Sequence, residues 1–241
     1  MFAANALGAT EKVLHSFTGG SDGAYPAGIL FDANGNIFGV TNSGGNNGCN
    51  SELSAGCGVV FEMVTQSGSW TESVIHVFDQ STDGGNPNAQ LVMDASGNIY
   101  GCTQYYGEHA TGSAFELMPS GGSWSETILD TFPSVDDGLD CDGLVLDPDE
   151  RLFGVSFSGG TNNYGLTFEL KSKPDGKWKE AVLYDFMGGS NDGDSPAAPP
   201  VFYPPSKTRD IMYGTTYEGG CDLSTRCTPE VNSPFAANRR S

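Results

Sequence analysis

"ANGNIFGVTNSGG", at residues 33–45, decides the fold because the chain writes it three more times. It returns as "ASGNIYGCTQYYG" (95–107), "PDERLFGVSFSGG" (148–160) and "TRDIMYGTTYEGG" (208–220). Each copy joins a turn to a short apolar strand that contains a glycine, and these glycines (Gly39, Gly101, Gly154, Gly214) are 53 to 62 residues apart. A phrase that returns at such an interval indicates a repeat architecture.

Each complete repeat offers four short strands, A to D. In the first repeat they come from "GILFDANGNIFGV" (28–40), "GVVFEM" (58–63) and "TESVIHVF" (71–78). Four antiparallel strands in about 50–60 residues are typical of a β-propeller blade, and the 34 glycines and 13 prolines suit short strands joined by turns. We therefore predict an all-β fold: a single four-bladed β-propeller domain over residues 1–241. The expected blades are approximately 27–79, 89–132, 143–186, and 197–220 completed by 1–18.

The two chain ends are expected to close the ring. Phe17, Phe78, Phe132 and Phe186 mark the D strands, but the A and B strands that belong with Phe17 are found only at the other end of the chain, at 201–203 and 211–216. "TEKVLHSF" (10–17) should therefore complete the fourth blade. Its third strand comes either from "MFAAN" (1–5), where Phe2 resembles Phe61, or from "PEVNSPFAAN" (229–238). We favour the N-terminal segment.

The charge balance limits the partners. The formal net charge is −19, from 30 acidic against 11 basic residues, which argues against nucleic acid and anionic lipid because both require a basic surface. No apolar run approaches the roughly 20 residues that a membrane-spanning helix needs. We expect no nucleic acid, no membrane insertion and a monomer.

The six cysteines favour disulfides over zinc ligation. Cys49 with Cys57, and Cys221 with Cys227, bracket short loops at matching points of the repeat, and neither pair has the CxxC spacing of a zinc site. Cys102 and Cys141 either pair across neighbouring blades or stay free. Disulfides imply an oxidising compartment. The start "MFAANALGAT" does not read as a signal peptide, so either a leader is absent here or the protein is intracellular. We favour the first alternative and expect a secreted or cell-surface protein.

The repeat resembles a known family. The run "EKVLHSFTGGSDGAYPAGILFDANGNIFGVTNSGG" (11–45), followed by "GVVFEM", is similar to the GloVer (Gloeo/Verruco) tandem repeat, and the similarity extends over roughly residues 10–220. The shared motifs are the aspartate–glycine loop, "GNIYG", the paired glycines, "FEL" and W-x-E. The resemblance implies a propeller-like repeat protein, often exported and sometimes anchored. It transfers no catalytic motif.

One face of the propeller should carry the function. The A–B and C–D connections are tight hairpins, whereas the D–A and B–C connections are long, so the long loops gather on one face, where ligand sites concentrate. The residues at this long-loop face that we expect to bind a ligand are Tyr25, Asn42, Asn86, Gln104, Tyr105, Tyr106, Asp140, Phe157, Tyr217 and Glu218.

Each D–A loop places an aspartate directly before a glycine: Asp22, Asp83, Asp137 and Asp192. The structural interpretation is that the aspartate caps the backbone of a turn. The functional alternative is a ring of carboxylates that binds Ca²⁺, which prefers oxygen ligands.

Blade two breaks the symmetry. Its B–C loop carries Tyr105, Tyr106, Glu108 and His109 where the other blades read "NSGG", "FSGG" and "YEGG". Tyrosine offers a sugar an apolar face with a polar tip, and Glu108, His109 or Asp137 can serve as acid or base. His15 and His76 occupy the D-strand position of Asp130 and Tyr184, and we interpret them as packing residues.

Two function classes fit these patterns. The first is a non-catalytic binding propeller that recognises a glycan or another small polar ligand at the long-loop face. The alternative is a carbohydrate-active enzyme, hydrolase or lyase, with one asymmetric axial pocket that uses carboxylates. The chain contains no serine nucleophile elbow, phosphate loop or nucleotide fingerprint.

Overall fold

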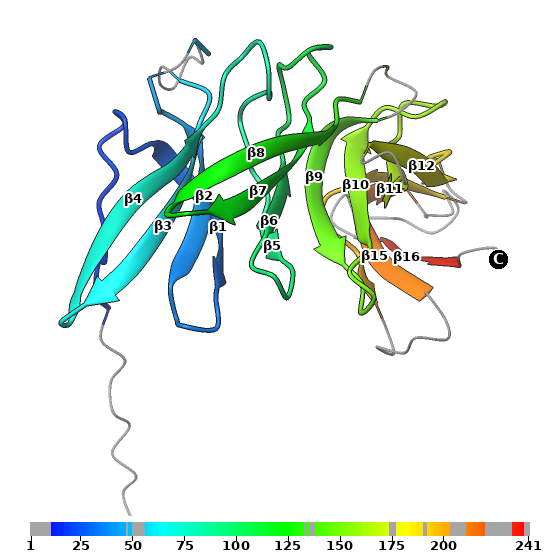
Figure 1. The fold of residues 1–241 in the computed structure, drawn as a ribbon. Coiled ribbons are helices and arrows are strands. Elements are labelled where there is room, and N and C mark those ends of the chain that lie inside the picture. The colour runs from blue at the N-terminus through cyan, green and yellow to red at the C-terminus, as the bar shows by residue number, and fades with distance from the viewer. Residues whose placement is uncertain are drawn as a thin grey trace, which may run out of the picture.

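The computed structural model describes residues 11–46, 48–49, 56–132, 134, 138–173, 177–189, 192–202, 211–219 and 233–238. Within these ranges the chain forms strands and no helix, and no segment is a helix long and apolar enough to cross a membrane. The strands make four antiparallel sheets, each of four strands. These sheets follow one another as the blades of a four-bladed β-propeller (Figure 1).

The first three blades are regular meanders in chain order. Blade one holds β1 (Ala24–Phe31), β2 (Ile37–Ser43), β3 (Val59–Gln66) and β4 (Ser69–Val77). Blade two holds β5 (Val92–Met93), β6 (Ile99–Cys102), β7 (Ala114–Ser120) and β8 (Ser123–Asp130). Blade three holds β9 (Leu139–Leu146), β10 (Leu152–Ser158), β11 (Leu166–Ser172) and β12 (Trp178–Asp185).

Blade four is built around β15 (Ile211–Gly219), which pairs with β13 (Gly193–Pro196), β14 (Val201–Phe202) and β16 (Ser233–Asn238). Gly214 lies opposite Phe235, as Gly39 lies opposite Phe61 and Gly101 opposite Phe115. β16 is therefore the third strand of this blade, and our preference for the N-terminal segment with Phe2 was wrong.

The repeated phrase is explained by its turn. Asp32 Oδ1 accepts the backbone N–H groups of Asn34 and Asn36, both at 2.8 Å. Asp94 and Asp147 cap their hairpins in the same way, with N···O distances of 2.9 Å. The side chain satisfies two donors that the turn leaves unpaired, so the A–B hairpins of the first three blades are determined locally.

The recurring glycine is explained by a phenylalanine. A Cβ on Gly39 would lie 2.5 Å from the ring of Phe61, and one on Gly101 would lie 2.6 Å from the ring of Phe115. The ring of the third strand therefore crosses the second strand at a point where only glycine leaves room for it.

The first three blades join through the aromatic residue that follows the fourth strand of blades one and two. Phe78 packs on Phe115 with ring centroids 5.1 Å apart, and Phe132 packs on Phe168 at 5.4 Å. Phe17 packs on Phe61 of blade one at 5.0 Å. The segment 11–18 thus occupies the place of a preceding fourth strand, although it has no strand structure.

The predicted pairing of this segment with blade four is not seen among the described strands. Blade one and the C-terminal strand β16 lie on opposite sides of the molecule in Figure 1. Closure of the ring by the two chain ends therefore stays a prediction.

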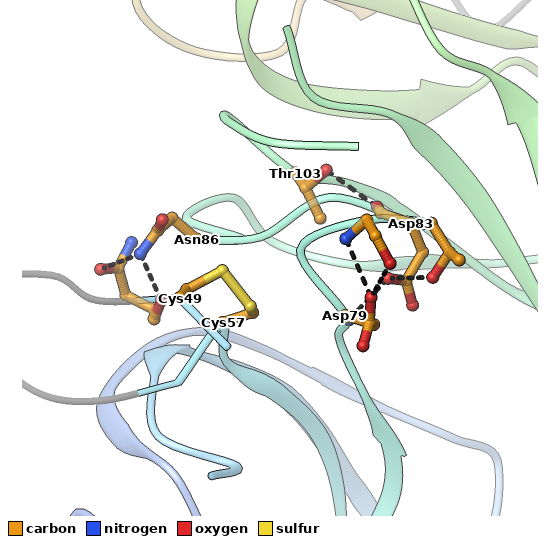
Figure 2. The surroundings of a disulfide bond; sticks show 9 residues. Cys49, Cys57, Asp79, Asp83, Asn86 and Thr103 are labelled. Atoms are coloured by element: carbon orange, nitrogen blue, oxygen red, sulfur yellow. Dashed lines mark hydrogen bonds between the residues drawn. A yellow bond between two sulfur atoms is a disulfide. The ribbon is translucent and has the colours of Figure 1, made fainter. Parts of the chain in front are cut away.

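Two disulfides reinforce the scaffold. The predicted bond between Cys49 and Cys57 is confirmed (Figure 2). Cys102 pairs with Cys141 and joins β6 to β9, so the alternative in which these two are free was wrong. Cys221 and Cys227 lie outside the described residues.

Candidate functional site

The connections divide between two faces, as predicted. The hairpins β1–β2, β5–β6 and β9–β10 gather at the bottom of Figure 1, and the long loops between β2 and β3, β4 and β5, and β6 and β7 gather at the top. The structure therefore has the long-loop face that the sequence predicts.

A polar cluster spans blades two and three on this face. We call it the Tyr105 cluster; it comprises Gln104, Tyr105, Asp140 and Asp142. Gln104 Nε2 donates to Asp142 Oδ1 at 3.1 Å, and the Tyr105 hydroxyl lies close enough to Asp140 for this carboxylate to raise the pKa of the hydroxyl. Asp140 also accepts the Ser158 hydroxyl at 3.0 Å. The cluster thus presents two carboxylates, an amide and a phenol beside each other.

The electrostatics of this cluster follow from its two acids. Burial, and then the charges of Asp140 and Asp142, raise the pKa of the Tyr105 hydroxyl. Burial also raises the pKa of Asp142; the Gln104 hydrogen bond opposes this shift and the Asp140 charge adds to it. The hydroxyl consequently stays a donor at neutral pH. The Tyr105 side chain is 46% exposed, so its ring is available from solvent.

Asn42 and Asn86 have a structural contact. The Asn86 side-chain amide donates to the backbone oxygen of Asn42 at 2.9 Å. The Asn86 backbone N–H donates to the carbonyl oxygen of Cys57 at 2.8 Å. Asn86 is buried and has a positive φ of 58°. This contact ties blade one to the loop that enters blade two.

The remaining predicted ligand-binding residues are dispersed. Tyr25 and Tyr217 are exposed, Tyr106 packs against the core between blades one and two, and Phe157 is half-buried. Glu218 is exposed on β15. Among the described residues, no side-chain hydrogen bond or ion pair joins these side chains to the Tyr105 cluster.

The two catalytic candidates that lie in the described residues, Glu108 and His109, are exposed and belong to no cluster of titratable side chains there. Glu108 and His109 are exposed near the tip of the loop between β6 and β7. Asp137 lies outside the described residues. Within the described ranges, neither Glu108 nor His109 belongs to a group of converging acids and histidines.

The aspartates of the D–A loops cap their own loops. Asp22, Asp83 and Asp192 accept the backbone N–H groups of Thr18, Asp79 and Met187 at 2.8, 2.6 and 2.7 Å, respectively. Each also contacts a side chain of the segment before the loop: His15, His76 or Tyr184. These contacts are what the structural interpretation expects.

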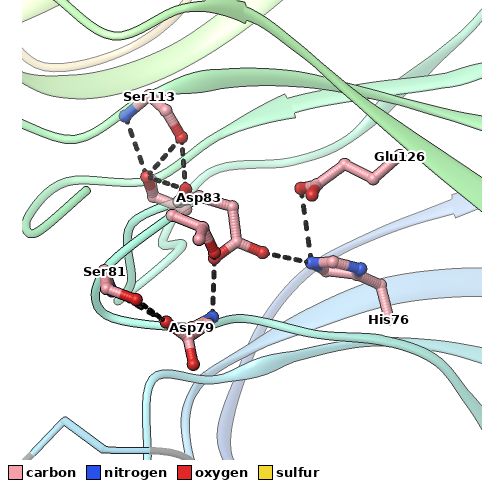
Figure 3. Close-up of polar contacts among 8 residues, drawn as sticks. His76, Asp79, Ser81, Asp83, Ser113 and Glu126 are labelled. Carbon is pink, nitrogen blue, oxygen red and sulfur yellow. Dashed lines mark hydrogen bonds and ion pairs between the residues drawn. The ribbon is translucent and has the colours of Figure 1, made fainter. Parts of the chain in front are cut away.

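His76, Asp83 and Glu126 form a group that the sequence analysis missed; we call it the seam triad. His76 Nε2 lies 2.7 Å from Asp83 Oδ2 and 3.3 Å from Glu126 Oε1 (Figure 3). Within the described residues it is the one group of at least three histidine, cysteine or acidic side chains with converging ligand atoms. A signal for it existed: Asp83 follows His76 by seven residues, as Asp22 follows His15, and Glu126 is the glutamate of W-x-E.

Burial shifts the pKa of Glu126, one of the two acids of the seam triad. It raises the pKa of Glu126 to about 7; the charge of Asp83 adds to this shift and that of His76 opposes it. In blade one, burial likewise raises the pKa of Glu72, the equivalent residue, which faces His15 and Asp22. The seam between the first two blades thus holds two neighbouring carboxylates with a single imidazole between them.

These features define a disulfide-bonded β-propeller repeat protein with an acidic, tyrosine-bearing loop face. The chain belongs to the Gloeobacter/Verrucomicrobia repeat family, whose model matches residues 2–225.

The chain is similar to solved structures of two other bacterial proteins. A crystal structure of a protein of unknown function from Dyadobacter fermentans DSM 18053 is 11% identical, with a TM-score of 0.52, over 88% of this chain and 52% of that one. A structure of a protein from Lactobacillus plantarum is 15% identical, with a TM-score of 0.48, over 88% of this chain and 55% of that one. The chain spans about half the length of these structures. No curated protein matches.

Proposed function

We propose that this protein is an extracellular, non-catalytic propeller that binds a glycan at its long-loop face, with the Tyr105 cluster as the centre of the site. The observation that carries the proposal is the exposed Tyr105 ring beside the Asp140 carboxylate and the Gln104–Asp142 pair. Sugar C–H faces stack on tyrosine, and sugar hydroxyls donate to carboxylates and exchange hydrogen bonds with amides.

The charge narrows the ligand class. Two acids lie in the cluster, and the whole chain carries a net charge of −19. An anionic sugar such as a uronate would be repelled by these charges, so the ligand we propose is a neutral or amine-bearing glycan. The disulfides support an oxidising, extracellular location.

A glycan array tests this function, with Tyr105→Ala as the disruptive variant. Tyr213→Ala is the matched control, because Tyr213 is similarly exposed (41% against 46%) but lies early in β15, away from the cluster. We expect Tyr105→Ala to weaken binding at least tenfold and Tyr213→Ala to leave it unchanged. Binding confined to acidic glycans, or equal loss in both variants, would overturn the proposal.

Turnover is the second readout of the same experiment. Bound polysaccharides are assayed for released reducing ends and for unsaturated products, in the wild type and in Glu108→Gln and Asp137→Asn. We expect no product with the wild type. Product that disappears in either variant would replace the binding function with the enzymatic alternative.

A further inference from the structure

The seam triad brings three donors to one point from two blades. His76 comes from β4 of blade one, Asp83 from the loop that follows it and Glu126 from β8 of blade two. The ligand atoms lie within 4.8 Å of one another, and the same imidazole nitrogen faces both carboxylates (Figure 3). Three donors directed at one point are the geometry of a small cation site.

Within the described residues, neither lysine nor arginine balances the charge of the triad. No lysine or arginine forms an ion pair with Asp83 or Glu126 in the described part of the chain. The three side chains are only 17%, 4% and 21% exposed for His76, Asp83 and Glu126, respectively. Glu126 Oε1 is buried and receives no hydrogen bond from the described residues. Two neighbouring carboxylates that are largely buried from solvent destabilise the fold unless a proton or a cation lies between them.

The surrounding contacts hold the donors in place. The His76 ring packs edge-on against Phe78, with centroids 4.8 Å apart. Asp83 uses its other oxygen, Oδ1, to accept the Asp79 backbone N–H at 2.6 Å. The backbone carbonyl of Asp83 accepts the hydroxyls of Ser113 and Thr103. Asp83 Oδ2 and His76 Nε2 therefore stay directed into the triad, as outer contacts orient the ligands in metal sites.

We infer that His76, Asp83 and Glu126 bind one divalent first-row transition cation, with Zn²⁺ as the reference ion, at the seam between blades one and two. Zinc takes nitrogen and carboxylate ligands at about 2.0–2.2 Å, so donors in a tetrahedral site lie about 3.3–3.5 Å apart. The contact between His76 and Glu126 already has this length at 3.3 Å, and the contact between His76 and Asp83 must widen from 2.7 Å.

The imidazole selects the class of cation. Ca²⁺ and Mg²⁺ prefer an all-oxygen shell of six or more ligands, whereas a nitrogen donor with two carboxylates suits zinc and its neighbours. The fourth position of a tetrahedral site is left to water. The ion would join blade one to blade two, much as the disulfide between Cys102 and Cys141 joins blade two to blade three.

The repeat supplies an internal comparison. The seam before blade one has His15, Asp22 and Glu72 in the same positions, but these residues do not converge as a ligand group. His15 Nε2 is 3.3 Å from Asp22. At the seam after blade two, Asp130 replaces the histidine and removes the nitrogen donor. The inference therefore concerns a single site of one ion per chain.

The test is calorimetric titration of the full chain with Zn²⁺ after treatment with EDTA and removal of the chelator. The expected result is one equivalent of Zn²⁺ per chain and a rise of several degrees in the melting temperature. His76→Gln and Glu126→Gln should each weaken binding at least tenfold. His15→Gln is the matched control and should bind as the wild type does, as should His109→Gln, which covers the third histidine of the chain.

Cobalt gives a spectroscopic readout of the same ligands. Co²⁺ bound by an imidazole and two carboxylates should produce visible absorption that His76→Gln removes. Circular dichroism verifies that each variant is folded. If His76→Gln is unfolded, the isosteric variant Glu126→Gln takes its place in the test. No stoichiometric Zn²⁺ binding at micromolar concentrations would overturn the inference. Binding that survives in His76→Gln, or that is lost equally in His15→Gln, would also overturn it.

Discussion

Cys102 at the end of β6 is bonded to Cys141 in β9, so one covalent link crosses the seam between blades two and three. The two residues are 39 positions apart, and a crosslink over a loop of this length removes unfolded-state entropy worth about 4 kcal/mol. We expect the double variant Cys102→Ala/Cys141→Ala to lose roughly that free energy of unfolding in denaturant titrations.

The bond between Cys49 and Cys57 closes only eight residues, and its removal should cost about 2.5 kcal/mol. An equal or larger loss for this shorter loop would contradict the argument.

Gly101 lies beneath the Phe115 ring, and this contact predicts that adding one methyl group at residue 101 destabilises the fold. A Cβ on residue 101 would lie 2.6 Å from the Phe115 ring and 2.7 Å from Leu91. Gly101→Ala should therefore reduce the free energy of unfolding by about 1–3 kcal/mol, the usual cost of overpacking. Gly20→Ala is the control, because a Cβ there has no neighbour closer than 3.4 Å and the backbone has no positive φ. A neutral Gly101→Ala would show that Phe115 moves aside freely.

The phenylalanines at the blade seams predict a graded loss of stability. Phe78 is fully buried against Phe115, whereas Phe17 makes the equivalent contact with Phe61 while partly exposed. Phe78→Ala should cost about 3–5 kcal/mol, as large-to-small core changes do, and Phe17→Ala about half as much. Chemical denaturation measures both. If Phe17→Ala had no effect, the segment 11–18 would not be held against blade one.

The shifted acid of the seam triad predicts a pH dependence in metal-free protein. The pKa of Glu126 is about 7 in the folded state, against an ordinary value of 4.5. Between these values the folded chain keeps a proton that the unfolded chain releases, so the free energy of unfolding falls as pH rises from about 4.5 to 7. The groups that face Glu126 here are His76 and Asp83.

Glu126→Gln should remove this fall and make the chain more stable than the wild type at pH 8, by up to about 3 kcal/mol. Melting temperatures recorded between pH 4 and pH 8 in the presence of EDTA measure the difference. Glu108→Gln is the control, because Glu108 is exposed and its loss should leave the slope unchanged. A wild-type curve that rises through this pH range would contradict the assignment.

Most of the scaffold could be predicted because its causes are local and repeated. The aspartates that cap the first three A–B hairpins, and the glycines that lie beneath phenylalanine rings, recur at regular positions along the sequence. The third strand of blade four could not be predicted in this way. Residues 2–5 and 235–238 both read "FAAN", and only the pairing of β16 with β15 distinguishes them.

The site was less predictable because its residues come together across blades. Gln104 and Asp142 are 38 positions apart, and the sequence analysis named only the first of them. His76 was interpreted as a packing residue, which is correct for its contact with Phe78. Its second contact, with Glu126, lies on the neighbouring blade, and the distance between blades cannot be read from the spacing within one repeat.

The self-contained hairpins have a consequence for evolution and engineering. Each aspartate-capped turn obtains its hydrogen bonds from within five residues, on the side of the molecule away from the long loops. The sequence of the long loops can therefore change while the hairpins on the opposite face continue to set the strand register. A graft of one blade's long loop onto another blade should leave the fold intact.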